Sequence, residues 1–243
     1  MQRILAVETA TKVCSVAVID EKEVLGEISL FVPQVHAERL MVMIDNLLDN
    51  LRLPYRDLCA VAVSIGPGSF TGLRIGLSVA KGIAFGQNKK LIAVPTLEAI
   101  AHSILIYSDN ETMIVPILHA RANEFYYSSF KLENSELKIM ADYKVGGADD
   151  IAAEFSPESI FVGEGVVEFS GYESVKRKFA VTSMRNIPVS AKGVAMIGVE
   201  KFKRGEFADL KTSVPMYIKD FIAVRGKTFP AEFHSGKKLL EKI

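Results

Sequence analysis

The densest set of residues that could do chemistry is the glycine-rich run GPGSFTGLRIG, from Gly66 to Gly76. It follows a predicted buried strand and opens a predicted helix, where backbone amides and the helix dipole favour an anion. The run lacks the ending of a P-loop, and Thr71 stands where a dinucleotide fingerprint needs its third glycine. A tight turn for close packing is the alternative reading. The predicted anion site comprises Gly66, Gly68, Ser69, Thr71, Gly72 and Arg74.

A second polar turn, with Glu8, Thr9 and Thr11, follows the first predicted strand. Actin-like ATPases keep an aspartate at this place to organise magnesium and phosphate. The glutamate and hydroxyl groups here are interpreted as a vestigial phosphate turn, or as groups that simply cap the turn.

Other reactive groups are scattered. No metal site is predicted, because the four histidines are never paired at a ligand spacing such as i, i+4. Nucleophile elbows of the Gly-x-Ser-x-Gly type are absent. Cys14 and Cys59 are expected to be reduced core thiols. Arg121 and Glu124 indicate either a polar hairpin or an interdomain contact. We therefore assign no catalytic residue.

Composition narrows the class of protein. The chain has 243 residues, with 29 basic and 29 acidic side chains and no formal net charge. That balance argues against a broad basic face for nucleic acid. No apolar run reaches the roughly 18 residues of a membrane helix, and the start does not resemble a signal peptide. We therefore expect a cytoplasmic protein without membrane contact.

Hydrophobic patterning predicts an α/β fold in which one order of elements occurs twice. Three strands, then a helix, then a strand occur in each half, although no residue-level repeat is visible. This order is typical of a ribonuclease-H-like domain, and two such domains make an actin-like or sugar-kinase-like body. The predicted divisions are a first domain at 1–106 with a returning helix at 191–205, a second, smaller domain at 107–190, and a peripheral tail at 226–243.

The individual elements follow from the same patterning. A strand at 91–94 is followed by a helix that Thr96 is expected to cap. The other predicted strands cover 4–7, 13–19, 24–31, 58–64, 113–118, 125–132, 137–145 and 160–162. The other predicted helices cover 36–51, 149–154, 191–203 and the segment from Gly72 to about residue 85.

Two helices of the first half have unusual surfaces. The helix after the glycine-rich run carries small residues at every fourth position, and each helical glycine costs roughly 1 kcal/mol relative to alanine. The helix at 36–51 is apolar beyond one face, because Met41, Val42 and Leu48 widen its apolar stripe. We expect the two helices to pack together and to form a partner interface. The predicted interface residues are Leu40, Met43, Ile44, Leu47, Gly72, Gly76 and Ala80.

The run from Gly66 to Gly76 resembles the hallmark of the bacterial TsaB (YeaZ) family. Supporting segments occur in the family's order, at Ile4–Thr11, His36–Leu40, Val94–Ala101 and Ala120–Tyr126. The resemblance weakens later and returns only at the turn Val162–Gly165. It implies two ribonuclease-H-like domains in the actin-like (ASKHA) ATPase fold.

The resemblance also implies a function in making N6-threonylcarbamoyladenosine at position 37 of tRNA. It implies a non-catalytic scaffold or activating subunit that pairs with the catalytic paralogue TsaD and works with the ATPase TsaE. A homodimer is expected in isolation, with tRNA contacted indirectly through the complex. No tightly bound cofactor is expected, and ATP or ADP at the shared interface stays open.

One departure from TsaD supports a subunit that is not itself an enzyme. TsaD has a His-x-x-x-His metal motif after the strand that here ends at Val94, whereas this chain has no histidine there until His102. The alternatives are an actin-like ATPase with its own turnover, a relative of the M22-type metallopeptidases, and a homodimer without a role in tRNA modification.

Overall fold

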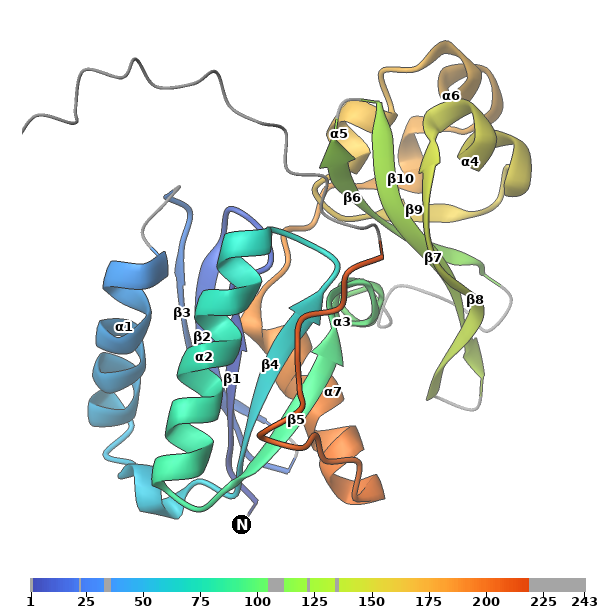
Figure 1. The fold of residues 1–243 in the computed structure, drawn as a ribbon. Coiled ribbons are helices and arrows are strands. Elements are labelled where there is room, and N and C mark those ends of the chain that lie inside the picture. Colours follow the sequence, from blue (N-terminus) through green and yellow to red (C-terminus); the bar gives the residue numbers. More distant parts are fainter. Residues whose placement is uncertain are drawn as a thin grey trace, which may run out of the picture.

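The computed structural model describes residues 2–21, 23–32, 36–104, 112–121, 123–133 and 136–218. These residues form two five-stranded sheets, each accompanied by helices (Figure 1). The strand orders are β3-β2-β1-β4-β5 and β10-β9-β6-β7-β8, so the second order, read backwards, repeats the first. We call the two halves the first lobe and the second lobe. The repeated topology confirms the predicted pair of ribonuclease-H-like units in an actin-like fold.

The first sheet is mixed, because three opening strands form an antiparallel meander and two later strands add in parallel. β1 pairs antiparallel with β2 and parallel with β4, which places it at the centre of the sheet. Every residue of β1 and β2 is buried, as expected for strands covered on both faces. The strands are β1 (Ile4–Glu8), β2 (Cys14–Ile19), β3 (Val24–Leu30), β4 (Ala60–Gly66) and β5 (Lys90–Pro95).

Helices cover both faces of the first sheet (Figure 1). α1 (His36–Asn50) and α2 (Phe70–Gly86) lie on one face, where they share a core with Leu5 and Val7. α7 (Ala191–Arg204) lies on the other face, against Ile4 and Ala6. The alternation along β1 follows from the two-residue period of a strand.

α3 (Thr96–His102) joins the two lobes. Ala99 packs in the core beneath α7, whereas Leu97 and Ile100 pack against strands of the second sheet. Thr96 does not cap the helix as predicted: Pro95 is the N-cap residue, and Thr96 Oγ1 is buried without a hydrogen-bond partner. Because α3 is covered by both lobes, the hydroxyl of Thr96 has no access to solvent.

The second sheet repeats the meander and the parallel addition with shorter helices. Its core is rich in phenylalanine, and Phe125, Phe161 and Phe169 form ring contacts there. The strands are β6 (Ile114–Arg121), β7 (Glu124–Glu133), β8 (Glu136–Gly147), β9 (Ile160–Val162) and β10 (Met184–Arg185). The helices are α4 (Ala148–Glu154), α5 (Val166–Phe169) and α6 (Glu173–Lys178).

The chain after α7 returns along the first lobe as an extended segment. Gly205 adopts a left-handed conformation with φ +71° and ends the helix, as its position predicts. Residues 206–218, which we call the C-terminal strap, then run beside β5 and α2 (Figure 1). The amide of Ala208 donates to Leu91 O at 2.8 Å, and the amide of Met216 donates to Ile65 O at 2.6 Å. This segment was not predicted from the sequence.

The predicted peripheral tail at 226–243 lies outside the described residues. Among the helices that are described, none combines the length and the apolar character needed to cross a membrane.

Candidate functional site

The glycine-rich loop and the β1–β2 turn pack directly against each other. The amide of Ser69 donates to Ala10 O at 2.6 Å. A Cβ atom on Gly68 would overlap the same carbonyl oxygen, so only glycine permits this approach. The loop therefore meets the opposing turn without an intervening space for a ligand at this point.

The start of α2 uses its own groups to satisfy its backbone. Ser69 is the N-cap residue, and its Oγ accepts from the amide of Gly72 at 3.2 Å. Thr9 Oγ1 donates to Gly72 O at 2.8 Å. A Cβ atom on Gly72 would overlap the Thr9 carbonyl oxygen, and one on Gly76 would overlap Thr9 Oγ1. The predicted partner of the small-residue ridge was wrong, because these two glycines meet the turn after β1 and not a helix.

Glu8 points into the protein and not into a ligand site. Its side chain is buried, Oε1 accepts from the amide of Ala10 at 2.5 Å, and Oε2 has no hydrogen-bond partner. Burial raises the pKa of this carboxyl to about 7, and the hydrogen bond from the Ala10 amide offsets part of that rise. The carboxyl therefore holds its proton more tightly than an exposed glutamate does.

A cleft of about 1130 Å³ lies between the lobes. Four of the six predicted anion-site residues line it: Gly68, Ser69, Thr71 and Gly72. Thr11 also lines it, whereas Glu8, Thr9, Gly66 and Arg74 do not. The second lobe contributes Leu118, His119, Ala120, Tyr126, Glu164, Gly165, Val167 and Glu168.

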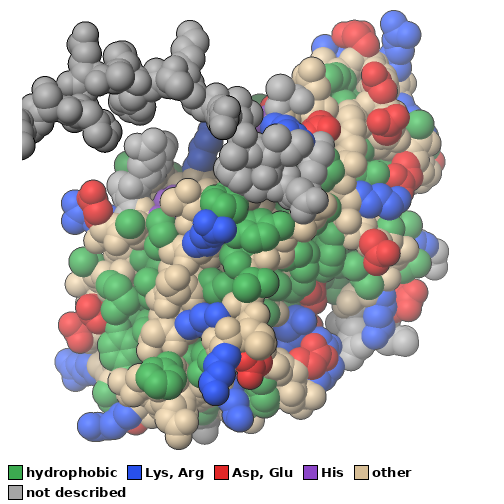
Figure 2. Space-filling model, in the orientation of Figure 1, with side chains coloured by type: hydrophobic (Ala, Val, Ile, Leu, Met, Phe, Trp, Pro, Cys, Tyr) green, Lys and Arg blue, Asp and Glu red, His purple; other side chains and the backbone are tan. Residues whose placement is uncertain are grey.

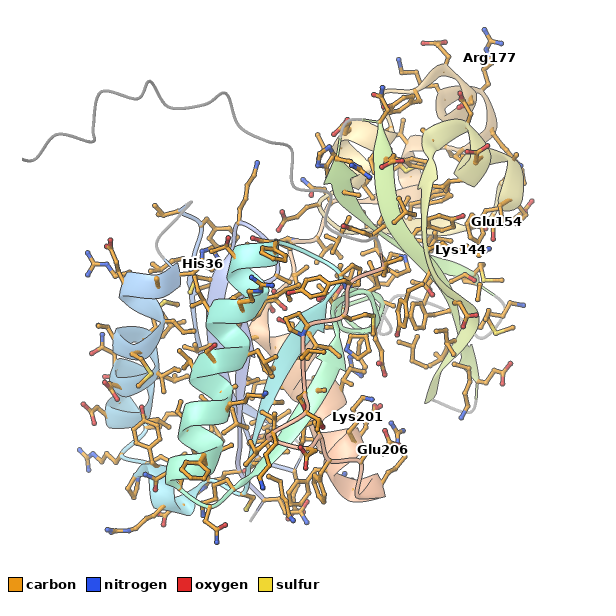
Figure 3. The ribbon with its side chains drawn as sticks, in the orientation of Figure 1. His36, Lys144, Glu154, Arg177, Lys201 and Glu206 are labelled. Carbon is orange, nitrogen blue, oxygen red and sulfur yellow. The ribbon has the colours of Figure 1, made fainter. Side chains whose placement is uncertain are left out.

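Polar contacts cross and line the cleft. Thr11 Oγ1 donates to Glu164 Oε1 at 3.0 Å, which ties the first lobe to the second. His119 Nε2 lies 3.3 Å from Glu168 Oε2 on the second-lobe wall. His36, at the start of α1 (Figure 3), places its Nε2 3.2 Å from Val13 O. His36 and His119 therefore both contact groups of this chain.

The fit of a magnesium nucleotide to this cleft can be tested on the atoms present. An actin-like fold implies such a ligand, bound by amides of the two loops. Here the amides of Ala10, Ser69 and Gly72 already donate to Glu8, Ala10 and Ser69. Two carboxylates on the opposite wall would repel phosphate, and the described residues contain no group of three or more His, Cys, Asp or Glu suited to a metal. These residues do not fit a magnesium nucleotide.

Arg74 serves the strap and not an anion. Its guanidinium carbon lies 3.6 Å from the centre of the Phe70 ring, and its Nε donates to the hydroxyl of Tyr217 at 3.0 Å. The rings of Phe70 and Tyr217 are 5.4 Å apart. Gly66 likewise faces the strap, because an added Cβ atom would lie 2.6 Å from Met216 O. Both residues were predicted to bind an anion, and the structure assigns them to this contact.

Arg121 and Glu124 resolve to the simpler reading. Arg121 Nε lies 3.0 Å from Glu124 Oε2 across the β6–β7 turn, which is a polar hairpin. Cys14 is buried in the core as predicted, whereas Cys59 is only partly buried. Burial raises the pKa of the Cys14 thiol to about 11.

The predicted interface residues are inside the chain. Their side chains are at most 4% exposed, or in the case of the two glycines buried, so they cannot contact a second chain. They are Leu40, Met43, Ile44, Leu47, Gly72, Gly76 and Ala80. The prediction of a partner surface at these residues was wrong, because the sides of the helices that carry them face the interior of the first lobe.

The outer sides of the same helices carry the exposed apolar residues. Met41 and Val42 on α1 are 42% and 47% exposed, and Phe85 on α2 is 80% exposed. Figure 2 views this side and shows hydrophobic side chains recurring across it. A shallow groove of about 400 Å³ is lined by Met41, Asp45, Tyr55, Val79, Gly82, Ile83, Gly86 and Gln87. The signal for this surface was the excess of apolar residues on α1 and the glycine at position 82.

Comparison with known proteins gives the family. Residues 24–199 match the family model of TsaD, tRNA N6-adenosine threonylcarbamoyltransferase. The chain is 27% identical to the tRNA threonylcarbamoyladenosine biosynthesis protein TsaB of Escherichia coli (strain K12), with 91% of this chain and 96% of that protein covered. TsaB of Bacillus subtilis (strain 168) is 28% identical, with 89% and 93% covered. The solved structure of YeaZ from Pseudomonas aeruginosa is 26% identical with a TM-score of 0.77, and covers 89% of this chain and 100% of its own. The chain belongs to the TsaD family and, within it, to the TsaB (YeaZ) branch.

Proposed function

We propose that this chain takes part in forming N6-threonylcarbamoyladenosine in tRNA, as a non-catalytic subunit that binds and activates a TsaD-type catalytic chain. The observation that carries the proposal is the likeness to TsaB proteins along nearly their whole length, 96% of the Escherichia coli protein. The match to the TsaD family model supports a partner of the same fold.

The two loops support a subunit without its own chemistry. The amides of Ala10, Ser69 and Gly72 donate within the protein and not to a ligand, and Glu8 is buried. A carboxyl whose pKa is raised to about 7 by burial is a poor magnesium ligand, because metal binding requires its ionised form. The catalytic step is therefore assigned to the partner.

The groove between α1 and α2 is the surface we propose for that partner. Gly82 lies within α2, and an added Cβ atom there would meet nothing within 4 Å. A glycine in a helix costs about 1 kcal/mol relative to alanine, and no contact among the described residues explains its presence at position 82. Close approach by a helix of another chain does explain it. The exposed Met41 and Phe85 would supply apolar contact on either side.

In this proposal the same surface forms a homodimer when the partner is absent. Because one surface cannot contact two chains at once, the homodimer and the pair with the partner exclude each other. TsaE would join the pair, and tRNA would be bound through the complex, since the chain has no net charge with which to attract it. ATP or ADP, if it takes part, would then bind where the two chains meet and not in the cleft of this one.

Reconstituted tRNA modification tests the proposal. TsaD, TsaE, the adenylate-forming enzyme, ATP, threonine, bicarbonate and a cognate tRNA are held constant, and this chain is added or left out. We expect modification to collapse without it. An unchanged yield would remove the assigned role.

A paired substitution tests the surface. Gly82→Arg places a long charged side chain in open space, so the chain should fold while binding of TsaD is lost. Val181→Arg is the matched control, because Val181 is 88% exposed on the second lobe. Equal affinity of both variants for TsaD, measured by calorimetry, would show that the groove is not the partner surface.

A further inference from the structure

The cleft between the lobes has a wall that nothing in the described chain covers. Val167 is 61% exposed there, which is high for an aliphatic side chain that lines a cavity. Glu164 and Glu168 stand on the same wall, while Lys12 is exposed on the opposite one. The amides of Ala10, Ser69 and Gly72 already donate within the protein, while the wall at Val167 offers apolar area and carboxylate acceptors. Its chemistry fits an apolar segment with positively charged ends.

The strap brings the chain to the rim of this cleft. Phe70 lines the cleft, and the ring of Tyr217 lies 5.4 Å from it. Arg74 holds both rings, by stacking on Phe70 and by donating to the Tyr217 hydroxyl. Tyr217 is the second-last described residue, so the chain leaves the described structure beside the cleft.

The residues that follow lie outside the described part of the chain, and their sequence matches the cleft. Residues 219–243 contain six Lys or Arg and three Asp or Glu. They begin with KDFIAVR, which has apolar residues between Lys219 and Arg225. Seven extended residues span up to about 25 Å, which is ample reach from Tyr217.

We propose that residues 219–225 bind in the cleft between the lobes as an internal peptide ligand. Phe221 and its apolar neighbours cover the wall at Val167, and the basic ends face Glu164 and Glu168. Asp220 is available to Lys12. Because the segment is tethered at the rim, its effective concentration is in the millimolar range, so weak contacts are sufficient to hold it. The cleft that takes a nucleotide in other actin-like proteins is thereby used for the protein's own chain.

Tryptophan fluorescence tests the proposal, because the natural chain has no tryptophan. Phe221→Trp in the full chain gives one fluorophore inside the proposed segment, and Leu239→Trp gives one beyond it. We expect blue-shifted emission and weak acrylamide quenching for Phe221→Trp only. High salt should shift its emission part of the way toward that of Leu239→Trp, because salt screens the charge pairs.

Substitutions in the cleft separate this site from others. Glu168→Lys combined with Phe221→Trp should move the emission to the exposed value. Glu173→Lys is the matched control, because Glu173 is an exposed carboxylate of α6 that does not line the cleft, and it should leave the emission unchanged. Circular dichroism confirms that each variant is folded.

Three results would overturn the proposal. Emission of Phe221→Trp at the exposed value in the free chain is one, including the case in which protection appears only when TsaD is added. Protection that survives Glu168→Lys is another, since the segment would then bind elsewhere. Protection that grows with protein concentration would place the segment in a second copy. All use the isolated chain's own signal, so they are independent of the role in tRNA modification.

Discussion

The glycines on the inner side of α2 are closely packed, whereas those on its outer side face open space. On the inner side, a Cβ atom at Gly72 or Gly76 would overlap Thr9, so the structure of this chain requires both glycines. On the outer side, Gly82 and Gly86 face open space. Recurrent small residues on a helix therefore indicate close approach without saying what approaches. Only the inner pair is explained by the fold.

The largest effect is expected at the inner side. Gly72→Ala would place a methyl group against a backbone carbonyl, which cannot rotate away as a side chain can. We expect a loss of about 3 kcal/mol in the free energy of unfolding, at the upper end for overpacking. Urea unfolding of the variant measures it. Unfolding at the wild-type midpoint would show that the turn after β1 yields and that the inner glycines are not required.

Glu8, which lies beside Thr9, gives the next largest effect and depends on pH. Its pKa is about 7 in the fold against 4.5 for the free group, so the folded chain holds this proton more tightly. The contribution of this proton to the free energy of unfolding is fully present below about pH 4.5 and is lost as pH rises through 7. Glu8→Gln keeps the acceptor for Ala10 and does not titrate.

We therefore expect the free energy of unfolding of Glu8→Gln, relative to that of the wild type, to increase by roughly 3 kcal/mol in total as the pH rises from about 5 to 8. Thermal unfolding across that range measures the difference. A constant difference at every pH would mean that Glu8 is ionised in the fold and that the turn reaches solvent.

The outer side should respond with the opposite sign and a smaller size. Gly82→Ala adds a methyl group in open space and should raise the stability of the isolated chain by about 1 kcal/mol. If this glycine serves partner approach, the same substitution weakens binding of TsaD. If the variant gains stability and still binds TsaD fully, partner approach does not explain Gly82, and the outer side of α2 has no functional need for glycine.

The smallest effect concerns the edge of α2 that holds the strap. Arg74→Ala removes one stacking contact and one hydrogen bond, both exposed, and should cost about 1 kcal/mol. The local readout is hydrogen exchange of the Met216 amide, which should become faster while amides of β1 do not change. Lys81→Ala is a useful companion, because Lys81 Nζ donates to Ser213 O at 2.6 Å.

The fold was largely predictable from the sequence. Strands buried on both faces and amphipathic helices such as α7 have strong periodicity, and their order specified the topology twice. The approach of Thr9 to α2 also had a signal that was not used. β1 and β4 are parallel neighbours, so the turns that follow them meet at one edge of the sheet.

The strap and the exposed apolar surface of α1 and α2 were harder to predict from the sequence. Residues 206–218 have no periodic pattern, and single hydrogen bonds hold them to elements far away in sequence. For α1, the sequence shows more apolar residues than one face needs but not which face the sheet takes. The division of the chain at residues 106 and 190 stays a prediction, which limited proteolysis would test.

The return of α7 to the first sheet affects how the chain can fold during synthesis. One face of that sheet needs Ala191 and Val194, which leave the ribosome only after the whole second sheet has been made. The second lobe is continuous in sequence and can assemble first, while this face of the first sheet stays uncovered at Ile4 and Ala6. A nascent chain stalled before α7 is therefore expected to need a chaperone for its N-terminal part and not for its middle.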